Sequence, residues 1–180
     1  MEQRLPEVHT IGAVPRPDGA VPGGDFDRAS PMAHPLFVLN GSNLNLLGKR
    51  EPHLYGTTTL AEVRERTEAL AAELGLQCDF RQTNHEGVMV DWIQEAFEKD
   101  AAVVINPAGF SFRSIPILDA LKLIRRPLIE VHITNIHQRS EHYRHSLMSL
   151  AATGVICGLG TGGYLLAVRA VAEALAATPP

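Results

Sequence analysis

The fold is predicted from residues 102–132, which read AVVINPAGFSFRSIPILDALKLIRRPLIEVH. Two short apolar runs rich in Val, Ile and Leu, residues 102–105 and 128–132, predict buried strands. The residues between them predict a short helix over 117–123. Two strands joined through a helix pair in parallel, because a parallel connection needs a crossover of roughly a dozen residues. This unit indicates an α/β protein.

The same alternation extends outward in both directions. Further strands are predicted at 36–39, 76–81 and 154–157, and further helices at 60–74, 88–99 and 164–177. Five strands with intervening helices predict a flavodoxin-like doubly wound five-stranded parallel sheet with helices on both faces. In such sheets ligands bind beyond the carboxyl ends of the strands, so the residues that follow each strand are the first candidates for function.

The composition fits one soluble domain of 180 residues, of which 45% are hydrophobic and 20% charged. The formal net charge is −4. A nucleic-acid or anionic-membrane surface needs clustered Lys and Arg, so neither partner is expected. No apolar run reaches the roughly 18 residues of a membrane span. With only Cys78 and Cys157, the chain has no disulfide framework, and we expect a cytoplasmic protein.

Residues 1–34 differ from the rest of the chain. They hold five prolines and four glycines, with few large apolar side chains. Such a segment cannot bury enough surface to offset the entropy lost on ordering. We expect a flexible N-terminal arm over 1–34, either without function or packed on a neighbouring subunit, and one catalytic domain over 35–180.

Polar side chains follow four of the predicted strands, in residues 40–43, 82–87, 106–109 and 130–135. Because parallel strands end at the same edge of a sheet, these groups converge on one rim. The needs of folding do not readily explain this convergence, and an enzyme is favoured.

Other site classes fit less well. The run GLGTGG at 158–163 satisfies G-x-G-x-x-G, but the strand that should carry a ribose-binding acid is missing after it, so we expect a tight turn that packs the last helix close to the sheet. His132, His137, His142 and His145 share no helix face and lack Cys-rich or H-E-x-x-H partners, which argues against zinc. A flavin phosphate loop, a receiver acidic cluster and a G-x-S-x-G elbow are also missing from the sequence.

Several segments, taken together, resemble type II 3-dehydroquinate dehydratases. The longest is NGSNLNLLGKREPHLYG at 40–56, and QTNHEG at 82–87, DWI at 91–93, NP at 106–107, IEVHITN at 129–135 and ATGVI at 152–156 follow in the same order. The resemblance covers about residues 35–175 and implies elimination of water from a small cyclic ketoacid through an enolate, without cofactor or metal. It also implies a homo-oligomer in which trimers gather into a dodecamer.

The resemblance assigns the proton-transfer steps to four residues. Tyr55 would be the general base as a phenolate. A tyrosine in water ionises only near pH 10, so such a base needs a nearby cation, and Arg50 on the same loop can supply it. His132 would protonate the departing hydroxyl, oriented by Glu130 two residues earlier on the same strand face.

The resemblance assigns binding roles to another set. Asn43 and Asn106 would hold the dipoles that stabilise the enolate oxygen, as in an oxyanion hole. The backbone amides of Ile133 and Thr134 would bind the substrate carboxylate. The segment 46–55 would act as a lid that excludes water before proton abstraction. Taken singly, each of these residues has an ordinary structural explanation as well; their joint presence favours catalysis.

The chain departs from the family pattern at the substrate-binding positions. Phe112 stands where the family has a histidine, and Tyr143 where it has an arginine, both of which bind ring hydroxyls. Arg144 lies one residue later. Ser42 replaces a proline, whereas Asp119, which in the family reaches a neighbouring subunit's site, is retained.

Three hypotheses follow from these departures. The first is a 3-dehydroquinate dehydratase of the shikimate or quinate pathway in which Arg144 or another side chain compensates. The second is a paralogue that performs the same enolate chemistry on a related cyclic carboxylate with fewer hydroxyl groups or larger size. The third is a non-catalytic scaffold protein, which the intact Tyr55, Arg50 and His132 disfavour.

Overall fold

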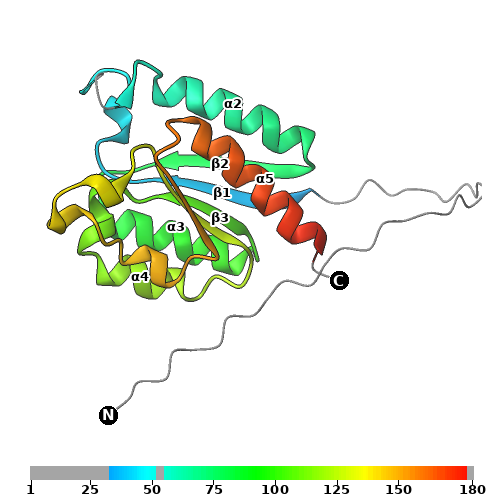
Figure 1. The fold of residues 1–180 in the computed structure, drawn as a ribbon. Helices are drawn as coiled ribbons and strands as arrows, with labels where there is room; N and C mark the ends of the chain where they lie inside the picture. The colour runs from blue at the N-terminus through cyan, green and yellow to red at the C-terminus, as the bar shows by residue number, and fades with distance from the viewer. Residues whose placement is uncertain (1–32, 52–54, 178–180) are drawn as a thin grey trace, which may run out of the picture. The chain divides into compact units, whose positions relative to one another are not determined.

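The computed structural model of the protein describes residues 33–51 and 55–177. Five strands in these residues form one parallel sheet in the order β2-β1-β3-β4-β5 (Figure 1). Their bounds are β1 (His34–Asn40), β2 (Leu76–Gln82), β3 (Ala102–Asn106), β4 (Leu128–His132) and β5 (Gly154–Cys157). This is the flavodoxin-like strand order, and the predicted fold class is confirmed.

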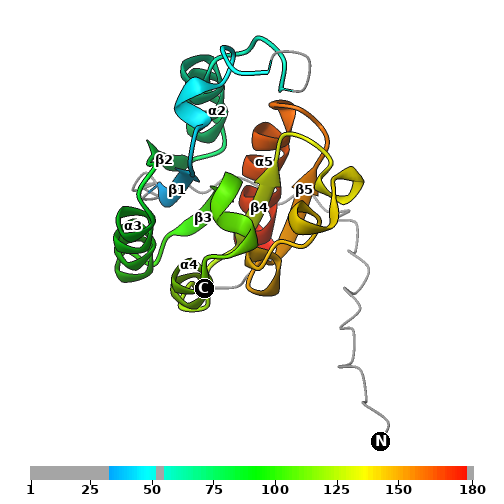
Figure 2. The same ribbon diagram turned by 90° about the vertical axis from the view of Figure 1, so that its left-hand side faces the viewer.

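Helices cover both faces of the sheet. On one face lie α2 (Leu60–Glu73) and α5 (Gly162–Ala177), and on the other α3 (Glu86–Glu98) and α4 (Ile115–Leu121) (Figures 1 and 2). Side chains alternate along a strand, so Leu36 and Val38 pack toward α2 and α5, while Phe37 and Leu39 pack toward α3 and α4. Two apolar layers therefore bury the central strands from both sides.

Side-chain caps fix the starts of two helices, one of them where it was predicted and one two residues earlier. In α2, Thr59 accepts from the Glu62 amide and the Glu62 carboxylate accepts from the Thr59 amide, which fixes the predicted start at Leu60. In α4, the Ser114 hydroxyl caps the Ile117 amide, so the helix begins at Ile115, two residues before the predicted start.

The glycine-rich run 158–163 is a tight turn that seats α5 on the sheet. Gly158 and Gly160 have φ values of 84° and 61°, which favour glycine. A Cβ added at Gly163 would lie 3.3 Å from Val131 Cγ1 and 3.4 Å from Ile156 Cγ2. The expected close packing of the last helix is confirmed.

The expected N-terminal arm lies outside the described residues, apart from Ala33 and His34. His34 already belongs to β1, so the strand begins where the arm was expected to end. None of the helices in the described part of the chain is long and apolar enough to cross a membrane.

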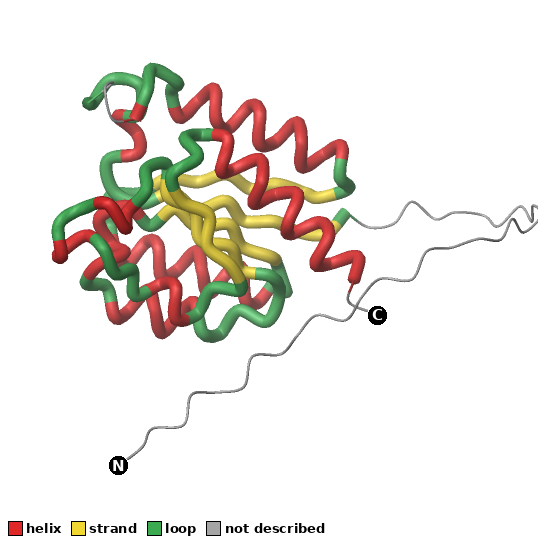
Figure 3. The backbone as a smooth tube through the Cα atoms, viewed as in Figure 1, coloured by secondary structure: helices red, strands yellow, loops and turns green. Residues whose placement is uncertain are grey.

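The loops after β1, β3 and β4 gather beyond the carboxyl ends of the strands (Figure 3). They contain short 3-10 turns: η1 (Leu44–Leu46), η2 (Ala108–Phe112), η3 (Ile136–Gln138), η4 (Glu141–Tyr143) and η5 (Met148–Leu150). The ends of β1 and β3 meet closely there, because the Gly41 amide donates to Asn106 O at 2.8 Å. A Cβ at Gly41 would lie 2.1 Å from the Pro107 carbonyl oxygen.

We therefore predict that Gly41→Ala lowers the free energy of unfolding by about 1–3 kcal/mol, because the added methyl group forces the β1 and β3 loops apart. Gly87→Ala is the matched control, since a Cβ there meets nothing within 4 Å and the position is helical. Urea denaturation of both variants measures the difference. Equal stability of the two variants would contradict this account of the contact.

Candidate active site

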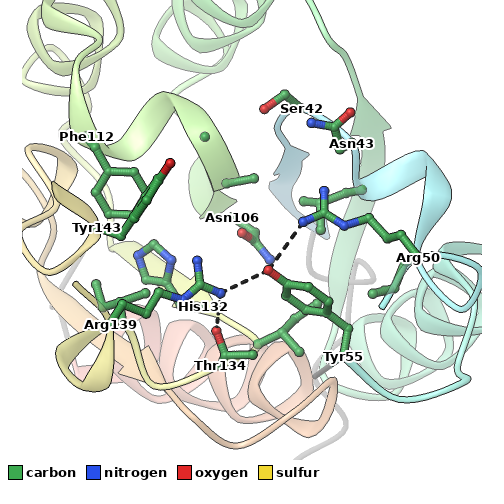
Figure 4. A pocket seen from close by; sticks show the side chains of 16 residues that line it. Ser42, Asn43, Arg50, Tyr55, Asn106, Phe112, His132, Thr134, Arg139 and Tyr143 are labelled. Carbon is green, nitrogen blue, oxygen red and sulfur yellow. Dashed lines mark hydrogen bonds between the residues drawn. The ribbon is translucent and has the colours of Figure 1, made fainter. Parts of the chain in front are cut away.

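A cavity of about 290 Å³ opens among the loops at the carboxyl ends of the strands (Figure 4). It is lined by nine of the eleven residues predicted for the site: Asn43, Arg50, Tyr55, Asn106, Phe112, His132, Ile133, Thr134 and Tyr143. The described residues that line it also include Ser42, Leu44, Leu47, Ala108, Gly109, Ile136 and Arg139. Of the remaining two predicted residues, Glu130 lies behind His132 and Asp119 lies on α4.

The Tyr55 hydroxyl oxygen receives hydrogen bonds from two guanidinium groups. Arg50 donates at 3.3 Å and Arg139 at 3.0 Å. The Arg50 guanidinium carbon also lies 4.9 Å from the centre of the Tyr55 ring. Arginine has no acceptor atoms, so both contacts place positive charge against this oxygen. The pair stabilises negative charge on the oxygen more than it stabilises a neutral hydroxyl.

Arg139 is the functional candidate that the sequence analysis missed. It lies just after η3, beyond the rim segment that ends at residue 135, and it reaches back to Tyr55 across 84 residues of sequence. The same nitrogen donates to the Thr134 hydroxyl, which fixes the guanidinium at the cavity wall. The sequence offered one signal for Arg139, because a phenolate at Tyr55 needs a nearby cation. Arg50, which is closer in sequence, already met that need, so no second cation was sought.

His132 stands at the end of β4 with a buried carboxylate behind it. Its Nε2 lies 2.7 Å from Glu130 Oε1, and Glu130 is fully buried. The Ser146 hydroxyl donates to the same carboxylate oxygen and the Ser149 hydroxyl donates to the other. Neither serine was predicted. Together they satisfy a carboxylate that has no access to water.

Glu130 is held as an anion by these contacts. Burial acts to raise the pKa of Glu130, but the hydrogen bonds from His132, Ser146 and Ser149 outweigh it and lower the pKa below its ordinary value. An ionised carboxylate only accepts hydrogen bonds, so His132 Nε2 carries a hydrogen and donates it to Glu130. Nδ1 is then the ring nitrogen that does not contact Glu130.

A buried relay of hydrogen bonds orients the Asn106 side chain. Asn40 Nδ2 donates to the Arg81 carbonyl oxygen at 3.0 Å, which turns Asn40 Oδ1 toward Tyr164. The Tyr164 hydroxyl donates to that oxygen at 2.6 Å and accepts from Asn106 Nδ2 at 2.8 Å. Since a carbonyl oxygen only accepts, it sets the direction of every bond in the relay and thereby the orientation of the Asn106 amide.

Burial keeps Tyr164 a neutral donor in this relay. Its side chain is fully buried on α5, and burial raises its pKa well above the ordinary value although the hydrogen bond from Asn106 acts to lower it. The sequence analysis assigned Tyr164 only to the last helix, because one buried tyrosine in an apolar helix gives no separate signal.

Asn43 is held by its backbone rather than by its side chain. It adopts a left-handed conformation with φ 65°, which asparagine tolerates better than most residues. Its amide donates to Asn84 Oδ1 at 2.8 Å, and that oxygen also accepts from Gln82 Nε2 at 3.1 Å. The rim segment after β2 thus anchors the loop after β1, and the predicted convergence of these segments is observed.

The remaining predicted residues are placed as follows. Phe112 and Tyr143 contact each other edge to face, with ring centres 5.3 Å apart, and both line the cavity. Arg144 donates to the Arg139 carbonyl oxygen and pairs with Glu141, and it does not line the cavity. Asp119 is exposed and pairs with Lys122 at 3.2 Å.

Two further sequence predictions concern the histidines considered for zinc and the expected lid. Of the four histidines considered for zinc, only His132 is buried, while His137, His142 and His145 are exposed. The part of the chain that the structure describes holds no group of three His, Cys, Asp or Glu side chains arranged to bind a metal ion. The middle of the expected lid, residues 52–54, lies outside the described residues.

This arrangement suits a reaction with two proton transfers on one small anion. One wall presents an oxygen on which two cations favour negative charge, and another presents an imidazole backed by a carboxylate. The amide of Asn106 lies between them in Figure 4. A base, an acid and a polar group for a developing charge thus face one cavity.

Comparison with known proteins decides the family. Residues 34–172 match the family model described as dehydroquinase class II. This chain belongs to the class II dehydroquinase family. A 3-dehydroquinate dehydratase of Brucella canis is 54% identical over 141 residues, which cover 78% of this chain and 90% of that protein. A 3-dehydroquinate dehydratase of Caulobacter vibrioides is 53% identical over 139 residues, or 77% of this chain and 95% of that protein.

Solved structures of class II dehydroquinases share the fold. The crystal structure of the type II dehydroquinase from Propionibacterium acnes superposes with a TM-score of 0.76 at 46% identity, covering 79% of this chain and 98% of that one. A 3-dehydroquinate dehydratase-like protein from Bifidobacterium longum gives a TM-score of 0.61 at 32% identity, covering 79% of this chain and 98% of that one. The resemblance inferred from the motifs is confirmed.

The relay leads to a prediction about Tyr164. Tyr164→Phe removes one hydroxyl and leaves Asn40 Oδ1 and one Asn106 hydrogen buried without a partner. We expect the free energy of unfolding to fall by about 1–3 kcal/mol. Tyr143→Phe, which removes the same hydroxyl from a half-exposed ring, should change it by less than about 0.5 kcal/mol. Urea denaturation compares the two, and an equal loss in both would refute the relay.

The lowered pKa of Glu130 leads to a second prediction. A carboxyl group whose pKa is lower in the folded state than in the unfolded state contributes stability. That stability is complete above the unfolded pKa of about 4.3 and is lost as pH falls through the folded value. Wild-type protein should therefore exceed Glu130→Gln in stability at neutral pH, and the gap should shrink below pH ~4.3. Denaturation across pH measures it, with the exposed Glu73→Gln as control. A gap that does not change with pH would contradict the assignment.

Proposed function

We propose that this chain is a hydro-lyase that eliminates water from 3-dehydroquinate to give 3-dehydroshikimate through an enolate. The observation that carries the proposal is the Tyr55 oxygen with Arg50 and Arg139 both donating to it at the wall of a cavity that His132 also lines. The relatives named 3-dehydroquinate dehydratase, at 53–54% identity, support the choice of substrate.

In the first step Tyr55 acts as a phenolate and removes the proton next to the ketone of the substrate. The two guanidinium groups favour the anionic base before the step, and the ketone accepts the electron pair as an enolate. Asn106, oriented by Tyr164, and Asn43 provide dipoles for the enolate oxygen. Main-chain amides at Ile133 and Thr134 bind the substrate carboxylate in this proposal.

In the second step the enolate re-forms the ketone and expels the hydroxyl group, which takes a proton from His132 and leaves as water. Glu130 stabilises the cationic imidazole that precedes this transfer and holds the ring in place. The proton that Tyr55 removed returns to His132 through the departing water or solvent, so no net proton is consumed. The ketone already present in the substrate supplies the electron withdrawal, and no cofactor is proposed.

The direct test is a steady-state assay of the purified full chain with 3-dehydroquinate, following the absorbance of the conjugated enone product. We expect turnover that survives exhaustive chelation and dialysis. Activity that chelation removes and a divalent ion restores would overturn the cofactor-free mechanism. No turnover with a folded protein would overturn the proposed substrate.

The two cations on Tyr55 give a prediction that separates Arg139 from its neighbour. Tyr55→Phe should abolish measurable turnover, because it removes the basic oxygen and little else. Arg139→Ala should lower kcat by about 10- to 100-fold, the scale of a lost hydrogen bond to a charged group. Arg144→Ala, which removes the same charge five residues later and outside the cavity, should change kcat by less than about threefold. Similar losses in both arginine variants would contradict the role given to Arg139.

We also propose the assembly and location that the family resemblance implies, a trimer-based dodecamer in the cytoplasm. Asp119 supports the assembly, since it is exposed on α4 and does not line the cavity of its own chain. Light scattering of the native protein gives the mass directly, and a monomer would refute the proposed assembly.

A further inference from the structure

Two aromatic rings close the side of the cavity away from Arg50. Phe112 from η2 and Tyr143 from η4 meet at an interplanar angle of 89° with centroids 5.3 Å apart. In Figure 4 the pair stands opposite Arg50 and Tyr55, with His132 beside it. We call Phe112 and Tyr143 the distal wall.

The two ends of the cavity differ in the hydrogen bonds that their side chains offer. Around the Tyr55 oxygen lie Arg50, Arg139 and Thr134, which supply two positive charges and a hydroxyl. The distal wall carries no charge, and its one hydrogen-bonding group is the Tyr143 hydroxyl. A ligand in this cavity therefore meets ionic and hydrogen-bonding groups at one end and ring faces and edges at the other.

Neighbouring side chains do not add polarity to the distal wall. Arg144, next in the chain to Tyr143, is turned to the Arg139 carbonyl oxygen and to Glu141. Glu141, in η4 with Tyr143, has an ion pair with Arg144, lies 3.2 Å from His145 Nε2 and is 72% exposed. These charges are satisfied at the surface, outside the cavity lining.

The edge-to-face contact also holds the wall in place. An edge-to-face pair fixes the two rings relative to each other, and it ties η2, which follows β3, to η4, which follows β4. Phe112 is half-buried and Tyr143 is half-exposed, so the pair forms the boundary between cavity and solvent. The wall is a preformed apolar surface, available without rearrangement of the polar end.

We infer that the distal wall makes this site selective for cyclic carboxylates whose far ring edge carries few or no hydroxyl groups. The inference rests on the proposed function in placing the carboxylate and the reacting carbons at the polar end. A hydroxyl group pressed against the two rings loses its bonds to water, and the Tyr143 hydroxyl is the one hydrogen-bonding group that the rings themselves offer it. A bare ring edge loses nothing and gains dispersion contact with both rings.

The distal wall should weaken the binding of rings that carry hydroxyl groups at this edge. Each ring hydroxyl left without a partner should weaken binding by about 5- to 100-fold. The polar end contributes equally to both kinds of ring, so the difference between them reports the distal wall alone. The preference should therefore depend on Phe112 and Tyr143 and not on Arg50 or Tyr55.

A matched pair of unreactive acids tests the inference by calorimetry. The probes are 1,3-dihydroxycyclohexane-1-carboxylate and 1,3,4,5-tetrahydroxycyclohexane-1-carboxylate, which share the carboxylate, the ring and the hydroxyl groups at carbons 1 and 3, and lack the ketone needed for turnover. We expect the unmodified protein to bind the first at least tenfold more tightly. Equal affinity, preference for the tetrahydroxy acid, or failure to bind either acid would overturn the inference.

Variants of the distal wall give the second arm of the experiment. Phe112→His with Tyr143→Arg supplies donors at both positions, and we expect the preference to fall by at least tenfold or to reverse. Tyr143→Phe keeps both rings and should keep the preference for the less hydroxylated acid. A double variant that folds, as judged by its urea midpoint, and retains the original preference would also overturn the inference.

Turnover separates this inference from the proposed function. If the distal wall acts as inferred, kcat/KM for 3-dehydroquinate should rise by about 30-fold or more in the Phe112→His/Tyr143→Arg variant. Probe selectivity without any turnover of 3-dehydroquinate in either protein would refute the proposed substrate and leave the selectivity standing. Turnover by the unmodified protein that the double change does not increase would refute the selectivity and leave the function standing.

Discussion

The hydrogen bonds of Tyr164 join the two central strands to the last helix at the point where the cavity begins. Asn40 ends β1, Asn106 ends β3, and the two residues are directly opposite each other in the parallel pairing. The tyrosine between them comes from α5, which packs on the same face as α2. The sheet, the helix layer and the polar end of the cavity are thus fixed by one buried group, and the orientation of Asn106 follows from a main-chain carbonyl at the edge of the sheet.

The fold was readable from sequence because four of the five strands contain a separate apolar run, whereas β2, with the sequence LQCDFRQ, is mostly polar. Residues 128–132 and 154–157 were predicted with the bounds that the structure shows, and the other strands differ by one or two residues at their ends. Of the four α-helices that the structure describes, three begin two residues before the predicted start and α2 begins where predicted. The start of α4 is set by the hydrogen bond from the Ile117 amide to the Ser114 hydroxyl. A pattern of apolar residues does not reveal such a bond.

The candidate site was predictable only in part, for a physical reason. Residues at the end of a strand, such as Asn106 and His132, are placed by the sheet itself. Arg139, Ser146 and Ser149 lie in the loop between β4 and β5 and reach the site because that loop folds back over the end of the sheet. No periodicity marks such a path, so their contribution becomes visible only in three dimensions. Arg144 shows the opposite error, since proximity in sequence suggested a role that its side-chain direction does not support.

The loop between β4 and β5 performs several tasks within a short stretch. It supplies Arg139 beside Tyr55, Tyr143 in the distal wall, and the two serines on Glu130. An insertion or deletion there would shift all of these groups at once, so the loop tolerates a change of residue better than a change of length. A substitution at Tyr143 alone alters only the half-exposed boundary of the cavity. The lining of the cavity at its rim can therefore be altered by single substitutions while the loop keeps its length and its other contacts.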